Sequence, residues 1–302
     1  MNKAATPPGA WRRLRRNPVA LTALAILLTV IAFALFAPTI LDLDPHATSA
    51  AQFTAPHTAH PFGTDVNGRD SFARVIEGAR ISLLVGFCGA FISLFVGTSY
   101  GLISGYAGGR TDALMMRLVE ILYTIPRLII LILVTFIFDK HFKNWLVAVG
   151  LPGLVGYSKI IILIFSLGLI EWLTMARIVR GQVLALKSQQ FVLAARALGQ
   201  SHVRIILRHL LPNLAGIVII YLTLTIPAVI LDESFLSFLG LGVQAPQASW
   251  GSLLSEGAQV INPVKSYWWL LLFPAFVMSL TLLALNFLGD ALRDAIDPRS
   301  RR

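Results

Sequence analysis

The chain has 302 residues, of which 56% are hydrophobic and only 13% are charged, and its mean hydropathy is +0.74. Soluble domains carry about a quarter charged residues, so this composition excludes an ordinary soluble protein and indicates one that lies in lipid. The net charge of +10 does not indicate nucleic acid as a partner, because the basic residues flank apolar segments and do not alternate with aromatic ones.

Six stretches are apolar and long enough to cross a bilayer, which takes a helix of about 20 residues. They predict an all-α, polytopic membrane fold with spans at about 18–41, 81–106, 117–138, 160–180, 214–236 and 268–289. Residues 1–17 are expected to form an N-terminal tail, and 18–302 the transmembrane domain. The first span is too long for the apolar core of a signal peptide, so we expect it to be retained.

The distribution of lysine and arginine predicts the orientation, because these residues are commoner in cytoplasmic loops. With the N-terminus inside, 17 of them fall on the cytoplasmic side and 6 on the outer side. Both termini and the basic loop 181–213 are therefore expected to be cytoplasmic. The apolar segment 145–158 is short and broken at Pro152, so we interpret it as an insert on the outer side and not as a seventh span.

Gly97, Gly101 and Gly105 repeat at four-residue spacing within the second span. Such a stripe gives a helix one smooth face on which a neighbouring helix can approach closely. The neighbour can belong to this chain or to a second pore subunit, and the pattern alone leaves both open.

The loop 181–213 contains the strongest local signals for helix ends. Ser188 is a candidate N-cap and Gly199 a candidate left-handed C-terminal residue, and the helix between them carries an apolar stripe of Phe191, Ala194, Ala195 and Leu198. Ser201 is expected to cap a second helix, His202 to Leu211, which Pro212 ends. This pair of helices is either a lever attached to the fourth and fifth spans or a connector lying in the membrane interface.

Several motifs resemble those of ATP-binding-cassette importer permeases, in the dipeptide, oligopeptide and nickel group. The run from Ala194 through Arg196 to Gly199, followed by Leu211-Pro212, resembles the loop by which these permeases contact their ATPase, although Leu193 stands where the family has glutamate. Other matching runs are GTDVNGRD at 63–70, GYAGG at 105–109, MARIVRGQ at 175–182, ESFLSFLGLG at 233–242 and GDALRDAIDP at 289–298. The run at 175–182 is most similar to the second permease of the oligopeptide system.

The resemblance implies a type I importer permease that pairs with a homologous permease to form a pore in the bacterial inner membrane. It also implies two ATPase subunits inside and an extracytoplasmic binding protein that delivers peptides. The helix from Phe191 to Gly199 would then dock into the ATPase. The chain has no Gly-Lys pair, so it lacks a phosphate-binding loop; we expect no cofactor in this chain, with ATP and Mg on the ATPase subunits.

Two further groups of residues are candidate sites. The motif made by Gly63, Asp65, Gly68, Arg69 and Asp70 has the wrong spacing for a calcium loop, so we expect a turn held by an Arg–Asp pair that touches the binding protein. Asp232 and Glu233 lie near the outer end of the fifth span, where acidic groups are candidate functional residues.

Asp232 and Glu233 would either bind the amino terminus of a peptide or contact the partner permease, and Arg127 has the same two interpretations. No nucleophile–base pair or metal-ligand set points to an enzyme. The competing functions are an ion-driven secondary transporter, which often contains internal repeats and mid-membrane charges, and import of nickel chelates on the same scaffold.

Overall fold

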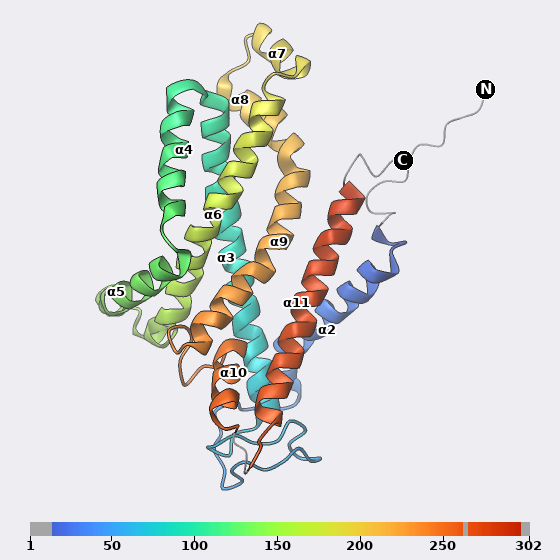
Figure 1. Ribbon diagram of the computed structural model, residues 1–302, viewed down its shortest axis with the longest axis vertical. Coiled ribbons are helices and arrows are strands. Elements are labelled where there is room, and N and C mark those ends of the chain that lie inside the picture. The colour runs from blue at the N-terminus through green and yellow to red at the C-terminus, as the bar shows by residue number, and fades with distance from the viewer. Residues whose placement is uncertain (1–13, 262–264, 297–302) are drawn as a thin grey trace, which may run out of the picture. The chain divides into compact units, whose positions relative to one another are not determined.

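The computed structural model describes residues 14–261 and 265–296, which are almost entirely helical (Figure 1). Within these ranges the β-structure is limited to one isolated bridge between Thr64 and Asp70, which confirms the all-α fold. Most of the predicted tail, residues 1–17, and the end of the motif at 289–298 lie outside the described residues. The chain divides into two compact units, residues 1–80 with 248–302 and residues 81–247, which are taken in turn below.

The first unit is built on two long helices, α2 (Pro18–Ile40) and α11 (Trp269–Ile296), which pack along each other. α2 begins after Asn17, whose side chain accepts hydrogen bonds from the N–H groups of the first turn. Most buried positions of α2 are alanines, and small side chains let two helices approach closely. A shorter helix, α10 (Trp250–Gln259), packs on α11.

The second unit contains most of α3 and all the helices as far as α9. In chain order these elements are α3 (Ser71–Ala107), α4 (Gly109–Thr124), α5 (Arg127–Ala148), the short 3-10 helix η1 (Pro152–Tyr157), α6 (Ser158–Leu186), α7 (Gln190–Ala197), α8 (His202–Ile205), the π-helical turn η2 (Ile206–Leu210) and α9 (Leu211–Phe238).

The glycine stripe of α3 packs against α6 of the same chain. A Cβ on Gly97 would lie 2.5 Å from Met175 Cβ, and one on Gly101 would lie 2.5 Å from the carbonyl oxygen of Ala176. Of the two neighbours that the sequence left open, the structure therefore shows the internal one. Glycine is required here because the two helix backbones are too close for any side chain.

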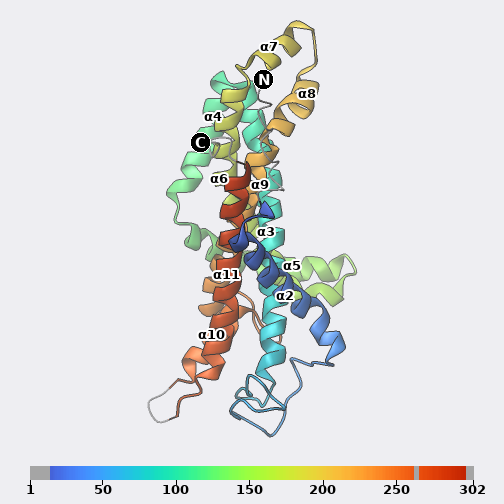
Figure 2. The same ribbon diagram turned by 90° about the vertical axis from the view of Figure 1, so that its right-hand side faces the viewer.

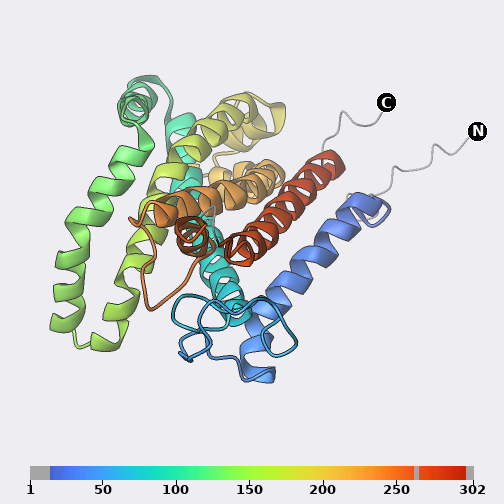
Figure 3. The same ribbon diagram turned by 60° about the horizontal axis from the view of Figure 1, so that its bottom comes forward.

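The third predicted span, 117–138, is wrong as a single helix. α4 ends at Thr124, α5 begins at Arg127, and the two helices are bent by 86°. Ile125 is extended, with φ −85° and ψ 127°, because a residue before proline is driven out of the helical region. In Figure 3, α4 is seen end on and α5 leaves it sideways before the chain returns along α6.

The other five spans are confirmed as helices that are long and apolar enough to cross a membrane. With the bent pair α4 and α5 counted as one span, the described residues contain six. α3 begins ten residues earlier than predicted, at Ser71, and α6 continues to Leu186. The segment 145–158 forms no additional span, because it consists of the end of α5, a turn and η1.

The helix expected to end at Pro212 instead runs on into α9. Proline lacks an N–H and crowds the carbonyl four residues earlier, yet the chain passes through it by way of the π-helical turn η2. The wider turn makes room for the ring. In addition, the side-chain amide of Asn213 donates to the carbonyl oxygen of His209 at 2.6 Å.

Candidate functional site

The chain reverses after α7 at Gly199. Its φ is +74°, a left-handed conformation that glycine adopts without strain. The N–H of Gly199 donates to Arg196 O at 2.9 Å and the N–H of Gln200 to Ala195 O at 3.1 Å, the two bonds of a Schellman helix end. The predicted end of the helix is confirmed, and Ser201 caps α8 as expected by accepting from Arg204 N.

The start of α7 differs from the prediction. Ser188 does not cap the helix; its hydroxyl donates to Ala185 O at the end of α6. The residue in the cap position is Gln189, whose side chain makes no capping bond. α6 is longer than expected, so Ser188 falls in the turn that ends α6 and not at the start of α7.

α7 has one buried and one exposed face. Val192 is fully buried and Ala195 is 4% exposed, and both lie in a core cluster with residues of α3, α6 and α9. Phe191, Ala194 and Leu198 face outward, with Leu198 81% exposed. The predicted stripe is therefore wrong in one member: Ala195 packs within the chain. The side chains that remain for another protein are those of Phe191, Leu193, Ala194, Arg196, Ala197 and Leu198. α7 itself lies beyond the end of α6 and the start of α9 (Figure 2).

α7 and α8 are also held to the end of α3. Tyr106 Oη lies 2.7 Å from His202 Nδ1, and the guanidinium of Arg196 lies 5.1 Å from the Tyr106 ring centre. One turn away, Lys187 Nζ donates to Gly105 O at 2.8 Å. From the sequence we expected the loop to be attached to the fourth and fifth spans only. The contact with α3 was not predictable, because no local pattern relates Tyr106 to a residue 96 positions later.

The motif at 63–70 forms a tight turn in the first unit. Gly63 and Gly68 both have φ of +70°, and a Cβ on Gly68 would lie 2.1 Å from Ser49 O. Asp70 accepts from Phe72 N at 3.0 Å at the start of α3, as an N-cap does. The turn expected from Asn67-Gly68 is confirmed, and both glycines are needed for its backbone.

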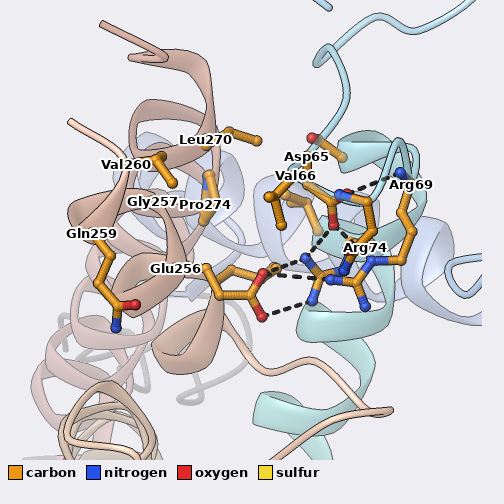
Figure 4. Close-up of a pocket in the computed structure, with 14 residues that line it drawn as sticks. Asp65, Val66, Arg69, Arg74, Glu256, Gly257, Gln259, Val260, Leu270 and Pro274 are labelled. Atoms are coloured by element: carbon orange, nitrogen blue, oxygen red, sulfur yellow. Dashed lines mark hydrogen bonds and ion pairs between the residues drawn. The ribbon is translucent and has the colours of Figure 1, made fainter. Parts of the chain in front are cut away.

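Asp65 is the centre of this motif. Its Oδ2 accepts from Arg69 Nε at 2.7 Å, the predicted Arg–Asp pair, and from Arg74 Nη1 at 2.8 Å. Arg74 in turn makes a two-pronged ion pair with Glu256 of α10, at 2.5 and 2.9 Å (Figure 4). The four charges balance and border a cavity of about 460 Å³. Sequence reasoning missed Arg74 and Glu256, which are 182 residues apart.

Asp232 and Glu233 point to different surroundings. Glu233 is fully buried and accepts from Ser82 at 2.9 Å and Ser237 at 2.7 Å, so it is enclosed by hydroxyl groups inside the second unit. Asp232 instead pairs with Arg127, with 3.0 Å between Asp232 Oδ1 and Arg127 Nη2. Two residues that the sequence analysis considered separately, Arg127 and Asp232, are therefore in contact. Arg127 also pairs with Glu171.

A further ion pair, between Asp112 and Arg180, joins α4 to α6. Arg180 donates to both carboxylate oxygens of Asp112, at 2.7 and 2.6 Å, and Ser104 of α3 donates to Asp112 at 2.5 Å. Bidentate pairs of this kind fix geometry as well as charge. This contact ties α3, α4 and α6 together, and two of these helices, α3 and α6, also pack against α7.

Comparison with known proteins identifies the family to which the chain belongs. Residues 75–302 match the family described as "binding-protein-dependent transport system inner membrane component", and residues 9–60 match the N-terminal transmembrane domain of oligopeptide transport permease C. The chain belongs to this family of transport-system membrane components and is a multi-pass membrane permease.

The relatives narrow the class further. The chain is 46% identical to the dipeptide transport system permease protein DppC of Bacillus subtilis, over 97% of this chain and 86% of that protein. It is 46% identical to the oligopeptide transport system permease protein OppC of Haemophilus influenzae, over 97% and 88%. It is 43% identical to OppC of Escherichia coli K12, over 97% and 91%.

Proposed function

We propose that this chain is one of two permease subunits that form the pore of an ATP-driven peptide importer. The observation that carries the proposal is its identity of 43–46%, over 97% of its length, to permeases of dipeptide and oligopeptide transport systems. Because the match covers 97% of the chain, it is not confined to one segment.

The proposed partner at α7 is an ATPase subunit, with ATP and Mg bound there and not in this chain. The exposed side chains of Phe191, Ala194 and Leu198 offer an apolar surface with one small residue, Ala194, between two large ones, which suits insertion into a groove. The buried side of α7 rests on α3, α6 and α9. A force on α7 would therefore reach all three helices through packed side chains.

The remaining partners are a homologous permease and an extracytoplasmic binding protein. In this proposal α7 and both termini lie on the cytoplasmic side of the bacterial inner membrane. The turn at 63–70 then lies on the outer side, where it would face the binding protein. The cavity beside Asp65 and Glu256 gives that face a concave, charged surface. The charge count of 17 basic residues inside and 6 outside supports this orientation.

The test is uptake by the whole complex in proteoliposomes. The chain, its companion permease and its two ATPases are reconstituted, the binding protein is supplied outside, and a labelled tripeptide is followed. We expect uptake that requires ATP in the compartment of the ATPases and persists when a protonophore collapses the proton gradient. Uptake that follows the proton gradient without ATP would instead identify an ion-driven carrier.

A further inference from the structure

Three ionisable side chains from three helices meet beside the break between α4 and α5. Arg127, the first residue of α5, has Nη1 3.4 Å from Glu171 Oε1 on α6 and Nη2 3.0 Å from Asp232 Oδ1 on α9. Glu171 lies near the middle of α6, a helix of 29 residues. Ionisable groups at such depth in a membrane are costly, so they mark functional positions.

The charges of this group do not balance. Two carboxylates share one guanidinium, and Asp232 Oδ2 is buried without a hydrogen-bond partner among the described residues, on a side chain only 8% exposed. A buried carboxylate oxygen needs a donor or a cation. The first turn of α5 adds only a partial positive charge, about half a unit, so the group keeps an excess of negative charge.

A cavity of about 210 Å³ opens beside Arg127 and Glu171, which both line it, whereas Asp232 is not among its lining residues. On its other side lie Tyr123 and Thr174, whose hydroxyl groups are 2.5 Å apart. Sites for drug-sized ligands are roughly 300 Å³ or larger, so this space suits one end of a molecule. In membrane carriers, interrupted helices characteristically line the substrate site, and the break at Ile125-Pro126 is such an interruption.

A second basic residue, Arg177, lies near the cavity but contacts an aromatic ring and not the two acids. The guanidinium of Arg177 lies 3.7 Å from the centre of the Tyr123 ring, where the face of the ring attracts it. Among the described residues Arg177 makes no ion pair with Glu171 or Asp232. Arg127 is therefore the cation that serves both acids, and it is 55% exposed and accessible from the cavity side.

We propose that Glu171, on the cavity wall, binds a primary ammonium group in transit, that Asp232 holds Arg127 in position beside it, and that this ammonium group is the amino terminus of the imported peptide. The inference rests on the proposed import of peptides and adds the residues that recognise the cargo. An ammonium group brings a full positive charge and three donors, so at Glu171 it balances the carboxylate charge that Arg127, which is also paired with Asp232, leaves over. A lysine side chain carries the same chemistry, so the test must separate the two sources.

The test uses a tripeptide without lysine that carries a photoreactive residue at position one or position three. The reconstituted complex imports each peptide under illumination, and the labelled residues are mapped by mass spectrometry. We expect the probe at position one to label residues 122–130 or 170–174, and the probe at position three to label other residues. A lysine-containing peptide with a blocked amino terminus should leave 122–130 and 170–174 unlabelled.

Variants test the acids directly. Asp232→Asn and Glu171→Gln keep the size of the side chain and remove its charge. Peptide uptake should therefore fall about tenfold or more, as expected for the loss of one hydrogen bond to a charged group, and labelling at position one should be lost. Asp139→Asn is the matched control, because Asp139 pairs with Lys143 and Ser158, away from this cavity. That variant should retain uptake and labelling.

Three results would overturn the inference. The first is equal labelling of the cavity by both probe positions, and the second is full uptake and labelling in Asp232→Asn. The third is loss of the companion permease from purified Asp232→Asn complexes, which would identify the three charges as a subunit contact. If the wild-type complex imports no peptide at all, the proposed function itself has failed, which is a different result.

Discussion

Tyr106, near the end of α3, and His202, at the start of α8, are joined by a hydrogen bond of 2.7 Å between Tyr106 Oη and His202 Nδ1. Their rings also meet edge to face, with centres 5.6 Å apart. α3 is the longest helix described, with 37 residues. The contact therefore connects the proposed ATPase-binding loop to a helix that runs the length of a membrane span.

We predict that Tyr106→Phe partly uncouples peptide uptake from ATP hydrolysis. The substitution removes one hydrogen bond and keeps the ring, a loss of about 1 kcal/mol or roughly a fivefold effect on a coupled equilibrium. Peptide uptake per ATP hydrolysed should fall several-fold, measured in proteoliposomes. Tyr100→Phe is the control, since Tyr100 donates to Met115 O away from α7; an equal effect of both changes would show general loosening and not coupling.

The ion pair between Arg74 and Glu256 is expected to stabilise the first unit. Arg74→Ala removes a buried guanidinium from Asp65 and Glu256; Asp65 keeps Arg69 and Glu256 is 44% exposed, so the expected cost is about 2 kcal/mol, that of one hydrogen bond to a charged group. The melting temperature of the purified complex, followed by tryptophan fluorescence, should fall by several degrees. Arg80→Ala, an exposed position on the same helix, should leave it unchanged. A stable Arg74→Ala variant would contradict the role of the pair.

Gly101→Ala tests the close contact of α3 and α6. The added Cβ would lie 2.5 Å from Ala176 O and 2.8 Å from Val179 Cβ, and forcing two packed helices apart costs about 2 kcal/mol. Gly181→Ala is the matched change in open space, with no atom within 4 Å, and it should stabilise by about 0.5 kcal/mol because alanine favours helix. The stabilities of the two variants are compared by urea or thermal unfolding. Equal stabilities would mean that α3 and α6 are not in contact at Gly101.

The spans were predictable because apolar length alone decides what can cross a bilayer. The break at Pro126 was not, although Pro126 was visible in the sequence. Pro38, Pro227 and Pro274 all lie inside unbroken helices of this chain, since neighbouring groups in a membrane helix can compensate for the lost hydrogen bond. The presence of a proline therefore does not tell whether the helix continues through it or bends by 86° there, as it does at Pro126.

The local features of the candidate sites followed from the sequence, and their distant partners did not. The end of α7 at Gly199 and the Asp65–Arg69 pair are set within a few residues by turn and capping chemistry. By contrast, Glu256 and His202 meet their partners only after the helices pack. The inward turn of Ala195 was missed for a related reason: a small apolar residue on α7 satisfies either face, and the position of Val192 decides between them.

The proposed contact between α7 and an ATPase is tested most directly by Ala194→Trp. Ala194 is exposed while its neighbour Ala195 is buried, so a bulky residue at 194 blocks the outer face of α7 without disturbing the fold. Ala148→Trp, at an exposed position at the end of α5, is the control for added bulk.

The decisive measurement is ATP-dependent peptide uptake by complexes that carry Ala194→Trp, compared with Ala148→Trp and with the wild type. The account predicts that uptake falls at least tenfold (roughly 1.4 kcal/mol of lost coupling or more) and that the ATPase subunits no longer co-purify, while the permease still inserts and keeps its melting temperature. Wild-type uptake with the ATPases retained would contradict it.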